Sequence, residues 1–173
     1  MVNARTTKAH GERPAGRRPE PVDREDLDPV LAFMQQLWSI DRGMRAISTE
    51  MRSRLGVTGP ERLILRMVGY CPGISAGQLA RLLRRHPSTL TGALDRLIRR
   101  RMLNGSVDEA DRRRLILTLT PSGRRISRLN SGTVEAHMRQ ALSSVTRDHL
   151  EVASNVLAVI ECELLSRSAG PET

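Results

Sequence analysis

At 173 residues, the chain has room for one domain of ordinary size, and we expect no second, catalytic domain beside it. Phe33, Trp38 and Tyr70 are its only aromatic residues, so the core must come from aliphatic side chains, which favours a mostly α fold over a β-sandwich. The formal net charge of +9 favours a polyanionic partner, although charge alone does not distinguish DNA from RNA or a membrane surface.

Cysteine content and hydropathy indicate where the protein works. Cys71 and Cys162 are its only cysteines, too few for a disulfide framework or a metal cluster, and we expect both to be ordinary packing residues. No N-terminal apolar run resembles a secretory signal, and charged residues interrupt every stretch that approaches the roughly 20 apolar residues of a membrane span. We therefore expect a soluble, cytoplasmic protein without a membrane partner.

The N-terminal part of the chain divides into a tail and a long helix. Residues 1–26 are rich in Gly, Pro, Arg and Glu with almost no large apolar residues, so we expect a disordered basic tail. Asp28-Pro29 is a capping residue followed by a first-turn proline, and apolar residues then recur at helical spacing as far as Leu55. The pattern predicts a helix over 29–55.

Three shorter helices follow, and their starts are marked by local chemistry. Thr58 with Glu61, and Ser75 with Gln78, have the spacing of capping boxes, and His86 directly precedes a proline. We predict helices over about 60–70, 76–84 and 87–101.

A hairpin and two long helices complete the chain. Leu115, Leu117 and Leu119 alternate with Ile116 and Thr118, which is the period of a strand with one buried face. Its partner is the stretch around 102–107, and the tip between them, 108–114, is polar except for one alanine. The final helices are predicted over about 121–145 and 147–166. The second carries an apolar stripe that suits a helix–helix seam: Leu150, Ala153, Leu157, Ile160 and Leu164.

Two short helices, a tight turn and a hairpin form the arrangement of a winged helix-turn-helix, in which the helix over 87–101 enters the DNA major groove. An inward apolar stripe leaves short hydroxyl residues and arginines outward, where they can approach base edges and phosphates. The candidate DNA contacts on this helix are Ser88, Thr89, Thr91, Arg96 and Arg99. Residues 81–125 hold twelve arginines against four acidic residues, a net +8, so nearly all the excess charge lies here. The alternative is an ordinary amphipathic helix with solvated arginines.

The wing and the strand after it resemble the MarR family of transcriptional regulators. The tip is Asp108-x-x-Asp111-Arg112-Arg113, and the second strand continues as Leu117-x-Leu119-Thr120-x-x-Gly123. These segments match the family's D-x-x-D-R-R and L-T-x-x-G patterns at every quoted position. Shorter matches upstream extend the likeness, which covers roughly residues 30–165.

The resemblance implies an α+β winged helix-turn-helix protein that forms a homodimer. The implied parts are an N-terminal dimerisation helix (27–56), a DNA-binding lobe (57–120), C-terminal dimerisation helices (121–166) and a flexible tail (167–173). It also implies that Arg113 reaches into the minor groove and that Asp111 organises the hairpin, so these two residues and Arg112 are the candidate DNA contacts of the wing.

Three positions depart from the family pattern. The family usually has Gly where Arg101 stands, Arg where Gly105 stands and Gln where Glu61 stands. We expect a slightly altered start of the wing and one phosphate contact fewer near Gly105, which arginines 99–101 can replace.

Family members often bind small aromatic or phenolic acids in a cleft between the dimer helices and the winged lobe. Met34, Trp38, Arg42, Met67 and Tyr70 could line such a cleft here, with Arg42 as a carboxylate clamp. Methionine and tryptophan at helical spacing are also typical of a core, and the sequence leaves both alternatives open.

Motifs of catalysis are missing from the sequence. It holds no nucleophile elbow, P-loop or dinucleotide fingerprint, and its four histidines are scattered, so we expect no enzyme activity, no cofactor and no metal site. The sequence predicts a regulator that binds double-stranded DNA as a homodimer and represses transcription from a pseudo-palindromic operator. A small effector would release it from the operator, and we expect it to be associated with the nucleoid while it is bound to DNA. The alternative is a DNA-organising protein of the same fold with little specificity and no ligand.

Overall fold

A computed structural model describes residues 27–168, with side chains described as far as Ser166. The chain divides into two compact units, the first ending at Ile40 and the second beginning at Asp41. Helix α1 (Pro29–Leu55) has the predicted bounds and runs through both. It begins where the Asp28 carboxylate accepts hydrogen bonds from the N–H groups of Val30 (2.9 Å) and Leu31 (3.3 Å). The predicted tail over 1–26 lies outside the described residues.

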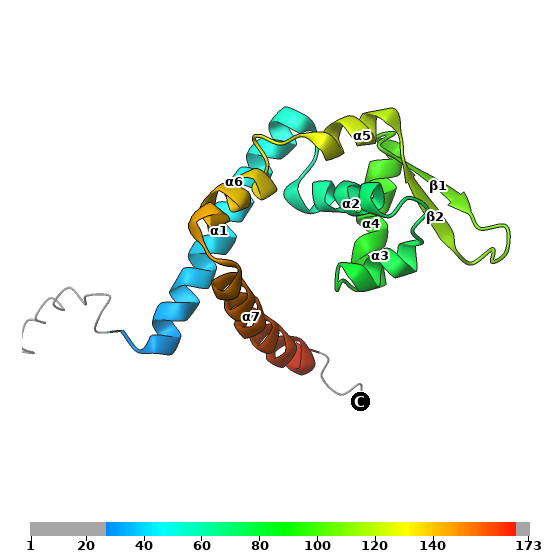
Figure 1. Cartoon of the computed structure of the whole chain (residues 1–173). Helices are drawn as coiled ribbons and strands as arrows, with labels where there is room; N and C mark the ends of the chain where they lie inside the picture. The colour runs from blue at the N-terminus through cyan, green and yellow to red at the C-terminus, as the bar shows by residue number, and fades with distance from the viewer. Residues whose placement is uncertain (1–26, 169–173) are drawn as a thin grey trace, which may run out of the picture. The chain divides into compact units, whose positions relative to one another are not determined.

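The second unit contains the winged helix-turn-helix lobe (Figure 1). Its elements are α2 (Gly59–Tyr70), α3 (Ala76–Leu82), α4 (Pro87–Arg99), β1 (Leu103–Val107) and β2 (Leu115–Leu119). Thr58 with Glu61 and Ser75 with Gln78 form complete capping boxes, as the sequence predicts. Helices α3 and α4 end two residues earlier than predicted, because Arg84 (φ 48°) and Arg101 (φ 53°) adopt left-handed conformations.

The sheet is a two-stranded antiparallel hairpin, which confirms the predicted strands. Its register pairs Leu103 with Leu119 at the base and Val107 with Leu115 towards the tip. The other edge of β2 contacts the loop before α3, where the Leu117 N–H donates to the Ile74 carbonyl (3.0 Å). This second contact fastens the hairpin to the helix-turn-helix, and the sequence analysis did not predict it.

The core of the lobe is aliphatic and joins all five of its elements. Leucines supply most of it, with two valines, one isoleucine and one alanine: Val57, Ile64, Leu65, Val68, Leu79, Ala80, Leu90, Leu94, Leu97, Leu103 and Leu117. At about 25 cal/mol per Å² of apolar surface removed from water, burial of each leucine contributes on the order of 2 kcal/mol. The apolar stripe of α4 and the inward leucine of β2 therefore belong to one cluster, which holds the helix and the hairpin together.

The C-terminal part corrects the prediction of one long helix over 121–145. The structure has α5 (Pro121–Arg128), α6 (Val134–Ala141) and a short 3-10 helix (Leu142–Ser144) in its place, followed by α7 (Arg147–Ser168). The break begins at Leu129, which is extended, and includes Gly132 at φ 62°. Thr133 then starts α6 as an N-cap, because its hydroxyl accepts a hydrogen bond from the Ala136 N–H at 3.2 Å.

A buried arginine of α2 explains why the break is stable. The Arg62 side chain is only 1% exposed and forms an ion pair with Glu135 of α6. Its guanidinium also donates to the backbone carbonyls of Ser127 and Leu129 at the end of α5. The last carbonyls of a helix have no partner within the helix, and Arg62 supplies donors to two of them here. Arg62 thus connects α2, the end of α5 and the start of α6.

Helix α7 differs from the lobe because its apolar side chains are exposed. Val152, Val156 and Val159 form a row at helical spacing, and Val159 is 71% exposed. The predicted seam residues Leu150, Leu157 and Leu164 are exposed as well. None of the helices in the described part of the chain combines the length and apolar character that a membrane crossing requires.

Candidate nucleic-acid interface

The helix-turn-helix places the start of α4 at the surface of the lobe. His86 is the N-cap of α4, and its Nδ1 lies 3.3 Å from the Ser88 backbone nitrogen, which donates to it, and 2.7 Å from the Ser88 hydroxyl oxygen. Pro87 occupies the first helical position. Before the turn, Arg84 forms an exposed ion pair with Glu161 of α7 at 2.6 Å. The first turn of α4 is therefore ordered by its own side chains.

The two faces of α4 are separated as the sequence predicts. Leu90, Leu94 and Leu97 are buried in the core. The five candidate DNA contacts of this helix are all exposed: Ser88, Thr89, Thr91, Arg96 and Arg99.

The three hydroxyl groups on the outer face differ in their partners. Thr91 donates to the Pro87 carbonyl at 2.9 Å, and Ser88 contacts His86. Thr89 has no hydrogen-bond partner for its hydroxyl among residues 27–168. Its donor and acceptor are therefore both open to a base edge or a phosphate.

Arg96 has a second role that the sequence analysis missed. Its Nε donates to Oε1 of Glu61 at 2.9 Å, and the Glu61 side chain is only 2% exposed. Arg100 lies 3.8 Å from the other oxygen of the same carboxylate. The carboxylate on α2 thereby holds two arginines of the last turns of α4, while much of the Arg96 guanidinium stays exposed.

The charge state of Glu61 follows from these contacts. Burial by itself raises the pKa of the carboxyl, but hydrogen bonds from the Arg96 side chain and the Thr58 N–H, with the charge of Arg96, outweigh it. The pKa of Glu61 is therefore lowered from its ordinary value of 4.5. Glu61 stays ionised at neutral pH, and its ion pair with Arg96 is maintained.

The tip of the wing is ordered by its two aspartates. Asp108 Oδ1 accepts a hydrogen bond from the Ala110 N–H (2.9 Å), and Asp111 Oδ1 accepts one from the Arg113 N–H (3.0 Å). Each is a turn in which an aspartate bonds the backbone two residues on. Arg112 and Arg113 are exposed, and neither forms an ion pair within the described part of the chain. The D-x-x-D-R-R segment thus has a fixed backbone and two free cations.

The base of the wing explains the L-T-x-x-G segment. The Thr120 hydroxyl donates to the Arg101 carbonyl (2.7 Å) and accepts from the Gly123 N–H (3.1 Å), so it caps α5 and fastens it to the end of α4. A Cβ atom on Gly123 would lie 2.0 Å from the Met102 carbonyl oxygen. Only glycine fits there. At Gly105, a Cβ atom would lie 3.0 Å from Leu115, so a larger residue requires a shift of the wing side chains.

The lobe geometry agrees with comparisons to known proteins. A model of the MarR family matches residues 55–114, which run from the end of α1 to the wing. The HTH-type transcriptional repressor Rv2887 of Mycobacterium tuberculosis (strain ATCC 25618 / H37Rv) is 30% identical over 123 residues, which is 69% of this chain and 84% of that protein. The chain belongs to the MarR family.

Solved MarR-type structures share the fold. The S. aureus MepR–DNA complex superposes with a TM-score of 0.65 at 19% identity, covering 76% of this chain and 97% of MepR. Streptococcus pneumoniae FabT in complex with DNA gives a TM-score of 0.60 at 24% identity, covering 79% and 98%. The winged helix fold predicted for this MarR-family chain is confirmed.

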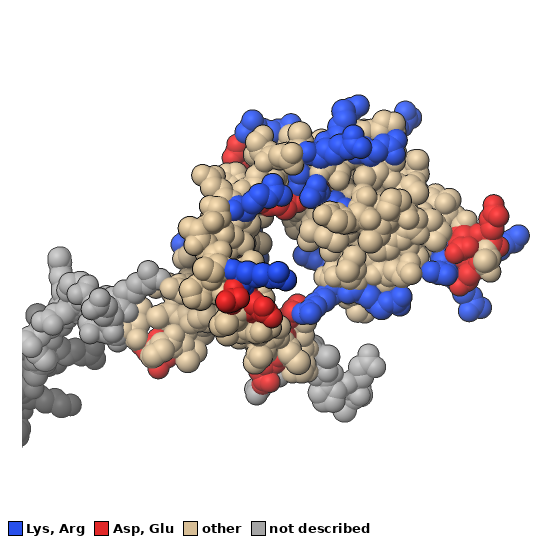
Figure 2. All heavy atoms as spheres, viewed as in Figure 1, with Lys and Arg blue, Asp and Glu red and all other residues tan. Residues whose placement is uncertain are grey.

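Arginines gather in groups over the lobe of this MarR-family protein. Figure 2 shows blue side chains along α5 and near α3, with acidic side chains beside arginines at the wing tip. The α5 group is Arg124, Arg125 and Arg128, and the α3 group is Arg81, Arg84 and Arg85. The positive charge of residues 81–125 therefore lies at α3 and α5 as well as on the outer face of α4.

The five residues predicted for an effector cleft stay a prediction. Met34 and Trp38 lie in the first compact unit, where both are exposed, whereas Arg42, Met67 and Tyr70 belong to the second. Met67 packs partly against the lobe core, and Tyr70 is 76% exposed beside Arg66.

The cysteines correct another expectation. Cys71 and Cys162 are both free and exposed, so the prediction that they are packing residues is wrong for this chain. Cys71 lies directly after α2, and Cys162 lies on the outward surface of α7, which the core does not cover. Within residues 27–168, no three His, Cys, Asp or Glu side chains are grouped as metal ligands would be.

Proposed function

We propose that this MarR-family protein is a sequence-specific transcriptional repressor that binds a pseudo-palindromic operator as a homodimer. The observation that carries the proposal is the outer face of α4, where an open Thr89 hydroxyl and the exposed Thr91 lie in front of arginines. Short side chains allow a helix to approach base edges, and the arginines suit phosphate contact. Repression is favoured by the similar M. tuberculosis protein, which is named as a transcriptional repressor.

The wing supplies the second proposed contact with DNA. Arg113 is exposed, and its backbone is held by Asp111. A narrow minor groove concentrates negative potential, and a guanidinium gives up its hydration more readily than an ammonium group does. We place Arg113 in the minor groove beside the half-site that α4 contacts, with Arg112 on the flanking phosphates.

The proposed homodimer follows from the exposed apolar side chains of α7. A helix whose apolar residues face water gains little stability from packing against its own chain. Helices without such packing are only marginally stable in water. Covering Val152, Val156 and Val159 with a second copy would remove this cost. A twofold dimer places two recognition helices about 34 Å apart, in successive major grooves.

The deciding experiment measures fluorescence anisotropy of the full-length protein with the DNA upstream of its own gene and with a scrambled duplex of equal length, over a series of salt concentrations. A repressor should prefer its operator by about a thousandfold or more. Equal affinity for both duplexes, fading together as salt rises, would instead indicate the DNA-organising alternative.

Two substitutions test the assignment of the grooves. Arg113→Ala should weaken binding to all duplexes roughly tenfold, whereas Thr91→Ala should change which base is preferred in the half-site. Arg139→Ala, an exposed arginine on α6, is the matched control and should bind as the unsubstituted protein does. Full operator affinity in both test variants would contradict the proposed contacts.

We further propose that a small aromatic or phenolic acid releases the protein from DNA by stabilising a dimer with the wrong spacing. Trp38 is the only tryptophan, so its fluorescence reports binding near it directly. Titration with 4-hydroxybenzoate should quench Trp38 and lower operator affinity, and Arg42→Gln should weaken both effects. Unchanged fluorescence and unchanged DNA affinity at millimolar ligand would overturn this part of the proposal.

A further inference from the structure

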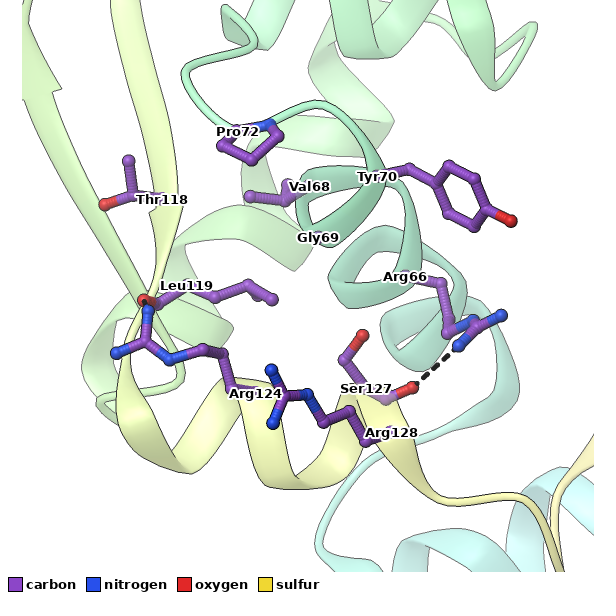
Figure 3. A pocket seen from close by; sticks show the side chains of 10 residues that line it. All are labelled: Arg66, Val68, Gly69, Tyr70, Pro72, Thr118, Leu119, Arg124, Ser127 and Arg128. Carbon is purple, nitrogen blue, oxygen red and sulfur yellow. Dashed lines mark hydrogen bonds between the residues drawn. The ribbon is translucent and has the colours of Figure 1, made fainter.

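A hollow of about 540 Å³ lies between α2, β2 and α5, entirely within the second compact unit (Figure 3). Its volume is in the range of small-molecule sites. It is separate from the outer face of α4 and from the wing tip, and it shares only Tyr70 with the predicted effector cleft. The operator and effector proposals do not use it.

The charged residues that line this α2–β2–α5 hollow are all positive. Arg66, Arg124 and Arg128 line it, and its lining includes no aspartate or glutamate. None of the three arginines forms an ion pair anywhere in residues 27–168. Three uncompensated cations around one hollow attract an anion, and the attraction is stronger beside low-dielectric walls than in open water.

Two of the guanidinium groups are held in place by the backbone. Arg66 Nη1 donates to the Ser127 carbonyl (3.1 Å), and Arg124 Nη1 donates to the Leu119 carbonyl (2.9 Å). Figure 3 shows Arg66 reaching from α2 towards the end of α5, while Arg124 and Arg128 project from α5 itself. These bonds use one N–H of each group and leave others to bind a ligand, so little side-chain order has to be gained on binding.

Apolar and aromatic residues line the hollow beside its arginines. Val68 and Leu119 line it, and the exposed Tyr70 ring lies with its centroid 5.9 Å from the Arg66 guanidinium carbon. Gly69 lets α2 lie close to β2 and α5, because a Cβ atom there would be 3.1 Å from Leu119 and 3.2 Å from the Ser127 hydroxyl oxygen. The hollow therefore offers cations with apolar and aromatic side chains directly beside them.

We propose that this hollow binds a small phosphate monoester, with the phosphoryl group among Arg66, Arg124 and Arg128 and the organic part against Leu119 and Tyr70. Guanidinium groups match phosphate oxygens with paired N–H donors. A phosphate monoester carries nearly two negative charges at pH 7, which three arginines without an acidic neighbour accommodate better than one carboxylate charge. The proposal stands independently of operator binding.

The first test is calorimetric titration of the full-length protein with phenyl phosphate at low salt. We expect saturable binding with one phenyl phosphate per chain, at least tenfold weaker binding of benzoate, and no detectable binding of phenol. Equal binding of benzoate and phenyl phosphate would overturn the assignment of a doubly charged ligand. Absence of phenyl phosphate binding would overturn the site.

The second test locates the ligand and separates it from DNA phosphate. Arg128 makes no hydrogen bond within residues 27–168 that substitution would break, so Arg128→Gln should fold normally, which a thermal melt checks. It should weaken phenyl phosphate binding at least tenfold, and the control Arg139→Gln should not. Unchanged phenyl phosphate affinity in Arg128→Gln would overturn the proposal. A variant that lost only DNA affinity would also overturn it, because the arginines would then serve the DNA backbone.

Discussion

Helices α4 and α7 both carry apolar residues at helical spacing, but only α4 buries them within its own chain. Leu97 of α4 is fully buried, whereas Val159 of α7 is 71% exposed. The difference is one of surroundings, since α4 packs on α3 and β1 while the valine row of α7 has no cover from the core. Helical periodicity therefore predicts a helix with a buried face, but not whether the cover comes from the same chain or from a second copy.

The largest expected effect comes from truncating a buried apolar side chain of α4. Leu97→Ala should lower the free energy of unfolding by about 2–5 kcal/mol, because it leaves a cavity in a closed core. Urea denaturation measures the change. Leu164→Ala removes the same side chain from an exposed position of α7, and a monomer should lose under about 0.5 kcal/mol. A larger, concentration-dependent loss in Leu164→Ala would show that α7 is covered in a dimer.

A charge placed in the valine row of α7 tests the proposed dimer interface more directly. Val159→Glu should raise the dimer dissociation constant roughly tenfold or more, because the carboxylate would be buried without a partner. Analytical ultracentrifugation over a range of protein concentrations measures it. Ala158→Glu lies on the polar side of the same helix and should leave the dimer intact. If Val159→Glu sedimented as the unsubstituted protein does, the valine row would not be the interface.

Glu61→Gln tests how much the ion pair between Glu61 and Arg96 stabilises the packing of α4 on α2. Glutamine keeps an oxygen for Arg96 but loses the charge, so we expect a loss of about 1 kcal/mol in unfolding free energy at pH 7. The pKa of Glu61 is lowered in the folded protein, so its contribution is complete above about pH 4.5 and disappears as pH falls through the lowered pKa. Denaturation from pH 7 to pH 3 should show the two proteins converging at acid pH. A constant difference would contradict the assignment to this carboxylate.

The smallest expected effect concerns the end of α4. Arg101 has φ 53°, a conformation that costs a residue with a side chain about 1 kcal/mol or more relative to glycine. Arg101→Gly should therefore raise the unfolding free energy by up to about 1 kcal/mol, reduced by the greater freedom of glycine in the unfolded chain. Arg101→Ala removes the same charge but keeps the strain, so its melting temperature should not rise. An equal gain in both variants would point to relief of charge repulsion instead.

Local chemistry explains what the sequence predicts well. Capping residues and prolines lie next to the helix starts that they determine, so the beginnings of α1 and α4 are predicted to the residue. The pairing of β2 with the stretch around 102–107 is predicted as well, but the register of that pairing is not. The assignment of the α4 faces follows from the same short-range periodicity. These features depend on neighbours in the sequence.

Long-range contacts account for what the sequence missed. Arg62 resembles a surface arginine until its partner Glu135, 73 residues away, is placed beside it. The break between α5 and α6 has local signals in Gly132 and Thr133, but its stability depends on that buried cation. The buried Glu61 likewise has its countercharge in Arg96, 35 residues on. Such pairs are visible only once the chain is folded.

Arg62 also limits how this lobe can be exchanged with that of a relative. A chimera joined at Thr120, where the wing ends, would carry Arg62 into a foreign scaffold without its acceptors at Ser127, Leu129 and Glu135. A buried cation that loses its partner costs about 3–5 kcal/mol, comparable with much of the stability of a small domain. A transplant should instead be joined after the first turn of α6, so that the cation travels with its acceptors.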